Sequence, residues 1–324
     1  MADELEDKIE FLARRAFDTG AVKINLDEPF IGRGGKQLPI NVKPGHLFEN
    51  YDDRKLVADI MEGAIRKKNI YFEFVVGINT LSLIPGSVLA KRFGVPLVTL
   101  VDDNTVKFID RKLSFQDNVD YVVGASRLST PYATQIADKN QCKLTYLKPK
   151  KNEIDFLTAN DPMPTVKDRV GMVVVEENHD LENGEGYLVR QRFDHDMQFH
   201  VDELRYPAEE CLADFDLNRK RGLVIGTLLS NVEFFTGDFG LYKRSKSSFS
   251  GLHLFGYSLR GTDAEMKKGR CYNRSILHLD ILLEAGFDNG YINRDELERM
   301  LAWRKNPSRW GARQGFPRVN SKTA

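Results

Sequence analysis

Three hydroxyl side chains lie close together at 125–130, directly after the apolar stretch YVVG. They are Ser126, Ser129 and Thr130, and Pro131 follows them. Proline is favoured in the first turn of a helix, so the pattern predicts a strand, a short turn and a helix. Backbone N–H groups at a helix start can point at an anion, and the helix dipole favours negative charge there. The turn is therefore a candidate for phosphate binding.

Two adjacent acids, Glu176 and Glu177, end a second apolar run at 169–175. Carboxylates at the end of a strand are suited to bind ribose hydroxyls or Mg²⁺. The next five residues add two more acids, and like charges about 4 Å apart repel by roughly 4 kcal/mol at an effective dielectric of about 20. The loop itself therefore disfavours a phosphate group. Asp102 and Asp103 form another adjacent pair, which no glycine-rich turn follows.

Apolar runs alternate with helix patterns around these residues. The segments 71–103 and 119–148 each predict a strand, a helix and a second strand. Continuous apolar strands separated by helices are typical of a parallel sheet that is covered on both faces. Duplication and the regularity of such folds both account for the likeness of the two segments, and we favour regularity. Near the carboxyl end, Asn293 and Glu296 have the spacing of a helix capping box.

The composition excludes several classes of protein. The 324 residues carry 47 basic and 47 acidic side chains, so the net charge indicates no particular partner. No run of about 18 apolar residues is present, and we expect no membrane span. The acidic, helix-patterned amino terminus differs from a secretory signal, so we expect a cytoplasmic protein. The three cysteines form no CxxC pair, which argues against a zinc knuckle and a disulfide framework.

Several segments of the first 150 residues resemble, in order, a type I phosphoribosyltransferase of the orotate phosphoribosyltransferase branch. FDTGAVKI and FIGRGGKQLPINVK are similar to the amino-terminal hood of that branch. FEFVVGINTLSLIPGSVLAKRFGVPLV is similar to its pyrophosphate-loop strand and helix, and the strand at 119–124 lies about where the family places its motif for phosphoribosyl pyrophosphate (PRPP). LDILLEAG and INRDELERML are similar to its closing helices. The resemblance covers about half of the chain.

The resemblance implies an α/β fold with a mostly parallel sheet flanked by helices, together with an extra C-terminal α+β region. We expect a phosphoribosyltransferase-like domain with its hood at 1–184. Additional strands and closing helices would pack on the same core at 185–302, and a basic tail would follow at 303–324. The usual dimer of the family implies a homodimer.

The resemblance also implies a ligand and a chemistry. The ligand would be PRPP or a nucleotide-like small molecule. An active member would transfer phosphoribose to a pyrimidine-like base, with Mg²⁺ and lysines holding the pyrophosphate. The implied residues are Ser126, Ser129 and Thr130 for the 5′-phosphate, Glu176 and Glu177 for ribose or Mg²⁺, and Lys36, Lys43 and Lys112 for pyrophosphate or base.

The chain departs from the PRPP motif of the family, because Gly124 and Ala125 stand where the acidic pair is expected. The acids Glu176 and Glu177 follow in a different loop. Both loops follow predicted parallel strands that would open at one sheet edge, so they could still meet. Two hypotheses follow: an active transferase, or a catalytically silent relative that acts in binding, regulation or assembly. The divided motif favours the second.

The segment 303–324 combines basic and aromatic side chains and contains no acid. Trp303, Trp310 and Phe316 could stack on bases while the cations neutralise phosphates. An acidic or nucleic-acid partner is therefore one expectation, and a solubilising tail or a subunit-docking arm is the alternative. Elsewhere, His195 and His200 have neither HxH nor HExxH spacing, and we expect no metal site formed by histidines.

Overall fold

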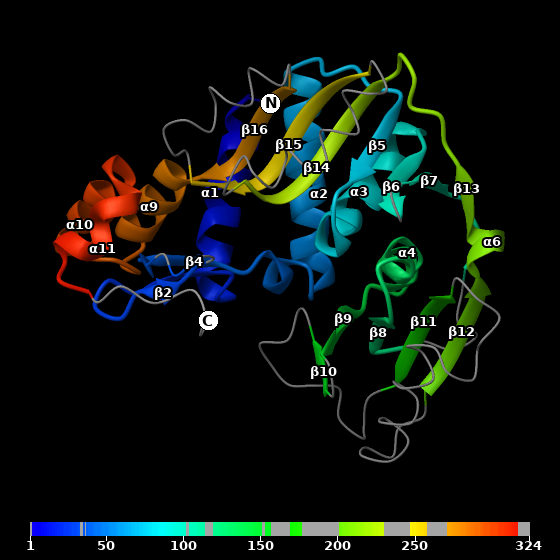
Figure 1. Ribbon diagram of the computed structural model, residues 1–324, viewed down its shortest axis with the longest axis horizontal. Helices are drawn as coiled ribbons and strands as arrows, with labels where there is room; N and C mark the ends of the chain where they lie inside the picture. Colours follow the sequence, from blue (N-terminus) through cyan, green and yellow to red (C-terminus); the bar gives the residue numbers. More distant parts are fainter. Residues whose placement is uncertain are drawn as a thin grey trace.

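The computed structural model places helices against two mainly parallel sheets, which confirms the predicted α/β fold class (Figure 1). Among the helices that the structure describes, none is both long and apolar enough to cross a membrane. The described residues are 2–32, 35, 37–101, 104–113, 119–150, 153–156, 169–176, 201–229, 247–257 and 271–316.

The larger sheet has the strand order β13-β7-β6-β5-β14-β15-β16. The five strands β6, β5, β14, β15 and β16 are parallel to one another. β7 pairs antiparallel with β6, and β13 pairs antiparallel with β7. The bounds are β5 (Phe74–Gly77), β6 (Leu97–Val101), β7 (Asn104–Phe108), β13 (Leu212–Asp214), β14 (Arg221–Leu229), β15 (Ser248–Gly256) and β16 (Cys271–His278).

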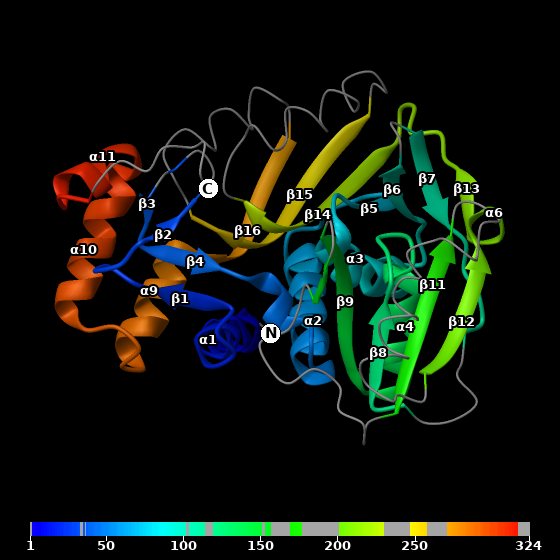
Figure 2. The same ribbon diagram turned by 60° about the horizontal axis from the view of Figure 1, so that its bottom comes forward.

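The smaller sheet has the order β10-β9-β8-β11-β12, and only the edge strand β10 is antiparallel to its neighbour. Figure 2 shows β8, β9, β11 and β12 side by side below the larger sheet. The whole sheet is inserted between β7 and β13 of the larger one. Its strands are β8 (Tyr121–Gly124), β9 (Lys143–Lys150), β10 (Glu153–Phe156), β11 (Val170–Glu176) and β12 (Val201–Pro207).

The helices cover the sheets and connect them. α2 and α3 pack on one face of the larger sheet, and α4 lies between α3 and β8 of the smaller sheet (Figure 1). Two short antiparallel pairs, β1 with β4 and β2 with β3, lie in the segment expected to form the hood. The helices are α1 (Ala2–Asp18), α2 (Tyr51–Lys67), α3 (Thr80–Phe93), α4 (Thr130–Asn140), α6 (Ala208–Cys211), α9 (Leu279–Asp288), α10 (Arg294–Lys305) and α11 (Pro307–Arg313), and the hood strands are β1 (Val22–Ile24), β2 (Phe30–Ile31), β3 (Gln37–Leu38) and β4 (Ile40–Val42).

The sequence predictions of single elements agree closely with the structure. Gly20 follows the first helix in a left-handed conformation with φ of 69°. The capping box of Asn293 and Glu296 is formed in both directions. The assignment of strands to sheets differs from the expectation, because the two strand-helix-strand segments enter different sheets. The expected domain boundary at residue 184 falls between β11 and β12, which pair with each other in the smaller sheet.

The aromatic side chains of the expected basic tail are part of the folded core. Trp303 on α10 is 0% exposed and Trp310 on α11 is 2% exposed. Phe316 packs against Trp310 with ring centroids 5.7 Å apart, and Arg304 forms an ion pair with Asp280. The two tryptophan rings are not accessible for stacking on bases, so the expectation of a nucleic-acid partner for this segment is not supported.

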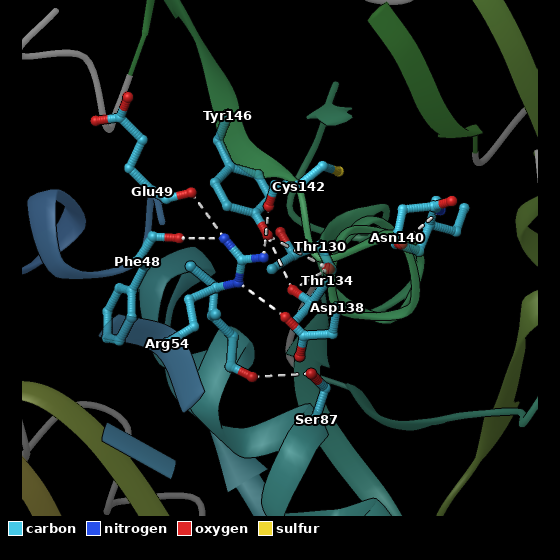
Figure 3. A network of polar contacts seen from close by, with 12 residues as sticks. Phe48, Glu49, Arg54, Ser87, Thr130, Thr134, Asp138, Asn140, Cys142 and Tyr146 are labelled. Carbon is cyan, nitrogen blue, oxygen red and sulfur yellow. Dashed lines mark hydrogen bonds and ion pairs between the residues drawn. The ribbon is translucent and has the colours of Figure 1, made fainter. Parts of the chain in front are cut away.

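The buried guanidinium of Arg54 joins α2, which packs on the larger sheet, to elements of the smaller sheet. Arg54 on α2 is only 1% exposed, and its Nε donates to Asp138 of α4 at 2.9 Å. Its Nη1 donates to the carbonyl oxygens of Phe48 and Glu49, and its Nη2 donates to that of Cys142 at 2.9 Å. Figure 3 shows these acceptors surrounding the guanidinium plane. Arg54 therefore ties α2 to α4 and to the start of β9.

A second buried network continues from this joint into α4. The hydroxyls of Thr134 and Tyr146 lie 3.0 Å apart, and the Thr134 hydroxyl donates to the carbonyl of Thr130 (Figure 3). Burial raises the pKa of Tyr146 well above its ordinary value, so the phenol keeps its proton. Gly124 lies beside this ring, and a Cβ on it would overlap Tyr146. The network thereby fixes α4 against β8 and β9.

We expect Arg54→Met to lower the free energy of unfolding by about 3–5 kcal/mol, because it leaves a carboxylate and buried carbonyl groups without their donor. Denaturant unfolding measures the change. Arg66→Met is the matched control, since Arg66 is 62% exposed and pairs with Glu62 on the same helix; its effect should stay below about 1 kcal/mol. Equal losses in the two variants would contradict the structural role of Arg54.

Candidate functional site

The topology of the larger sheet indicates where a ligand would bind. The chain passes from β5 through α3 to β6 on one side of β5, whereas β14 pairs with β5 on the other side. In open α/β sheets, ligands bind outside the carboxyl ends of the strands where the strand order reverses in this way. The candidate site is therefore the region at the carboxyl ends of β5 and β14, which is called the crevice below.

Arg127 reaches this crevice from the turn between β8 and α4. Its Nη2 donates to Thr99 Oγ1 at 2.7 Å and to the carbonyl oxygen of Ile78 at 3.0 Å, and it lies 3.5 Å from that of Gly77. The hydroxyl of Thr99 in turn donates to the Gly77 carbonyl at 3.0 Å. A half-buried cation thus lies at the carboxyl end of β5, beside the middle of β6.

The start of α3 closes the other side of the turn after β5. Asn79 accepts from the backbone N–H of Ser82 at 2.9 Å, and Ser82 Oγ accepts from that of Asn79 at 2.8 Å. The turn is tight, because a Cβ on Gly77 would overlap Leu83. The helix start is ordered by its own side chains and carries the positive end of the α3 dipole.

The predicted phosphate turn is present, and its hydroxyls bond within the turn. Ser129 Oγ accepts from the N–H of Ser126 at 2.9 Å and donates to the Ser126 carbonyl at 2.8 Å. Thr130 Oγ1 donates to the same carbonyl at 3.2 Å. Ser129 and Thr130 are 0% exposed. These contacts hold the turn that carries Arg127, and a role of the hydroxyls in phosphate binding stays a prediction.

The two strands that lead into the divided motif are parallel neighbours, and their carboxyl ends lie at one sheet edge. β8 and β11 are parallel neighbours in which Gly124 pairs with Val173. Ser126 Oγ lies 3.4 Å from the carbonyl oxygen of Val175, and Glu176 is the last residue of β11. The side chain of Glu176 and all of Glu177 lie outside the described residues, so their roles remain predictions.

Two of the three predicted lysines lie in described segments. Lys43 is exposed in the hood after β4, and Lys112 is exposed in the connection between β7 and β8. Neither forms an ion pair or a side-chain hydrogen bond with another residue that the structure describes. Lys36 lies outside the described residues. Their roles toward pyrophosphate or base therefore remain predictions.

Sequence reasoning missed β14 as a wall of the crevice. The apolar run GLVIGTLL signals a buried strand, but only the pairing of Val224 with Val76 places it beside β5. Its carboxyl end is Gly226, Thr227, Leu228 and Leu229, without a carboxylate. Mg²⁺ requires oxygen ligands that usually include carboxylates, and the Arg127 guanidinium would repel it. Among the side chains that the structure describes, no cluster could hold a metal ion.

A buried imidazole in the same sheet was also missed. His253 on β15 is 0% exposed, and its Nε2 lies 2.9 Å from Asn273 Oδ1 on β16. Two glycines make room for the pair, because a Cβ on Gly226 would overlap the His253 ring and one on Gly251 would overlap Asn273. Burial lowers the pKa of His253 to about 4, so its imidazole is neutral near pH 7.

Comparisons with known proteins agree with this architecture. The chain is 25% identical over 92 residues to the orotate phosphoribosyltransferase of Coxiella burnetii, which covers 28% of this chain and 44% of that protein. The solved structure of Leishmania donovani UMP synthase is similar with a TM-score of 0.50 and 12% identity, over 91% of this chain and 41% of that one. Orotate phosphoribosyltransferase from Francisella tularensis is similar with a TM-score of 0.46 and 8% identity, over 90% and 92% of the two chains.

No protein-family model matches the chain. The matched regions span less than half of the Coxiella protein and of the Leishmania chain. The sequence similarity and the shared architecture agree on one fold. The chain is phosphoribosyltransferase-like in fold, as its sequence resemblance implies.

We expect the buried His253 to make the protein acid-sensitive. Its pKa is about 4 when folded against 6.5 for the free side chain. The unfolded chain therefore binds the additional proton first, and stability falls as the pH drops from about 6.5 to about 4, by up to about 3 kcal/mol. Unfolding of His253→Gln across this range should show a smaller loss. His278→Gln, at a half-exposed side chain, should follow the wild type; identical profiles for all three proteins would contradict the assignment.

Proposed function

We propose that this protein binds a ribose-phosphate or nucleotide-type ligand at the carboxyl ends of β5 and β14 and does not transfer phosphoribose. The observation that carries the proposal is the position of Arg127, whose guanidinium lies at the point where the strand order reverses. The positive charge of the guanidinium attracts a phosphate group. The three oxygen atoms near its Nη2 hold the group in place before a ligand arrives.

The absence of transfer is argued from charge. Phosphoribosyl transfer, as the family resemblance implies it, needs acids that hold the ribose diol and Mg²⁺ that neutralises the departing pyrophosphate. β14 ends without a carboxylate, and the cation at the crevice is the guanidinium of Arg127. An arginine attracts the phosphates of a nucleotide and disfavours a metal ion beside it. These features support binding without turnover.

The second candidate function is transfer of phosphoribose from PRPP to a pyrimidine-like base with Mg²⁺. The observation that favours it is the meeting of the hydroxyl turn with the end of β11, because Ser126 contacts Val175 directly before Glu176. In this alternative Glu176 and Glu177 would bind ribose or Mg²⁺. In both candidate functions we propose that the protein is cytoplasmic and forms a homodimer.

Titration calorimetry on the full chain, with PRPP and with a nucleoside monophosphate, tests the proposal. We expect saturable heat without Mg²⁺ and no consumption of orotate when PRPP is present. Arg127→Ala should raise the dissociation constant by about tenfold or more, because a hydrogen bond to a charged group contributes about 1.5–3 kcal/mol. Arg127→Lys keeps the positive charge but not the planar guanidinium. Its dissociation constant should fall between those of the wild type and Arg127→Ala.

The matched control is Arg169→Ala, since Arg169 is 58% exposed and pairs with Asp120 at the edge of the smaller sheet. Its dissociation constant should stay close to that of the wild type. Orotate consumption that requires Mg²⁺ and vanishes in Glu177→Ala would establish the transferase and refute the silent form. No heat with either ligand at millimolar concentration would refute binding at this crevice.

A further inference from the structure

We propose a second anion site, for a small organic phosphate, in the pocket between α2, α3 and α4. The pocket has a volume of about 420 Å³, which lies in the usual range for small-molecule sites. The first turn of α2, the last turns of α3 and the outer face of α4 line it. The side chains on which the proposal rests are Tyr51, Lys55, Lys91, Arg92, Gln135 and Lys139.

This pocket is separate from the crevice at Arg127. α3 begins at the crevice with Thr80 and runs away from it, whereas Lys91 lies in its last turn. Eleven residues of α-helix correspond to about 16 Å along the axis. α4 likewise starts in the hydroxyl turn and carries Lys139 in its last turn. The amino ends of α3 and α4 thus lie toward the crevice, and their carboxyl ends line the pocket.

The pocket has an excess of positive charge. Five of its lining side chains are cationic, and Asp138 is the one carboxylate in the lining. Asp138 is paired with Arg54, and Lys55 and Arg92 are paired with Asp59. Lys91 and Lys139 have no ion-pair partner among the residues that the structure describes. They are the cations that an incoming phosphate could engage without breaking a pair.

The ends of α3 and α4 do not oppose an anion as strongly as bare helix ends would. Cations in a last turn are favoured by the helix dipole alone, so a single lysine there requires no ligand. Here the terminal carbonyls already accept hydrogen bonds: Ala90 accepts from Gly94 and Val95, and Ala137 accepts from Cys142. The last turns therefore direct lysines toward the pocket while their own acceptors are occupied.

Neutral groups could recognise the organic part of the ligand. The hydroxyl of Tyr51 and the carboxamide of Gln135 make no side-chain hydrogen bond to any described residue, and both side chains are half-buried. Val88 adds an apolar wall beside them. A ring or sugar bound against this wall could pair with Tyr51 and Gln135 while its phosphate contacts the lysines. The combination favours an organic phosphate over a bare inorganic ion.

The pocket is pre-organised by the joint at Arg54. The guanidinium forms part of the lining and is locked by Asp138 and three backbone carbonyls (Figure 3). It holds α2 against α4, so the pocket walls are in place before binding, which lowers the cost of ordering them. A ligand here would bridge elements of both sheets and would stabilise their contact by mass action.

Calorimetry on the full chain with pyrophosphate, adenosine diphosphate and adenosine as probes tests this site. We expect both anions to bind in a saturable manner, with the diphosphate ester tighter, and the neutral nucleoside at least tenfold weaker. Lys91→Gln combined with Lys139→Gln, both made in the Arg127→Ala background so that the crevice does not contribute, should weaken binding of adenosine diphosphate by tenfold or more. Lys91→Arg combined with Lys139→Arg should retain it, because the positive charges remain.

Lys68→Gln is the matched control, because Lys68 is an exposed lysine at the far end of α2; binding should change less than twofold. Arg127→Ala distinguishes the two sites. It should leave binding of adenosine diphosphate in the pocket unchanged and should weaken ligand binding at the crevice. Loss of diphosphate binding in Arg127→Ala alone would refute the pocket and leave the crevice standing. No saturable binding in the wild type, or tight binding only of an acidic protein or an oligonucleotide, would also refute a small organic phosphate site.

Discussion

The guanidinium of Arg54 is the contact on which the arrangement of this molecule depends. A charge that is 1% exposed is unfavourable unless it is paired and hydrogen-bonded, and here one carboxylate and three carbonyls accept from its three nitrogen atoms. Those acceptors come from the segment between β4 and α2, from α4, and from the residue directly before β9. Because they must converge on one planar group, the inserted sheet is held at a fixed position against α2.

That position explains the composition of the candidate site. α4 is anchored at its last turn by Arg54 and Asp138, so its first turn is directed at the carboxyl end of β5. The inserted sheet thereby places Arg127 at the carboxyl end of β5, where the described ends of β5 and β14 carry no charged side chain. One arginine holds the joint and another lies at the candidate site.

Local patterns predicted the single elements well. Gly20 ends the first helix, Pro131 lies in the first turn of α4, and Asn293 caps α10, because each depends on residues within one or two turns. The predicted turn at Ser126 and the strand before Glu176 are also present and adjacent. The role of Arg127 was beyond such patterns, since its partners at Gly77 and Thr99 lie 50 and 28 residues away.

The sequence by itself determined that the fold is α/β and where several of the helices begin or end, because hydrophobic periodicity and capping act over short distances along the chain. Only the tertiary structure decided that the strands divide between two sheets, that β14 and not β8 lies beside β5, and that Trp303 and Trp310 are buried. Several apolar strands could each pair with β5 equally well on pattern alone. The choice among them depends on how the whole set of side chains packs, and on which arrangement satisfies buried groups such as Arg54.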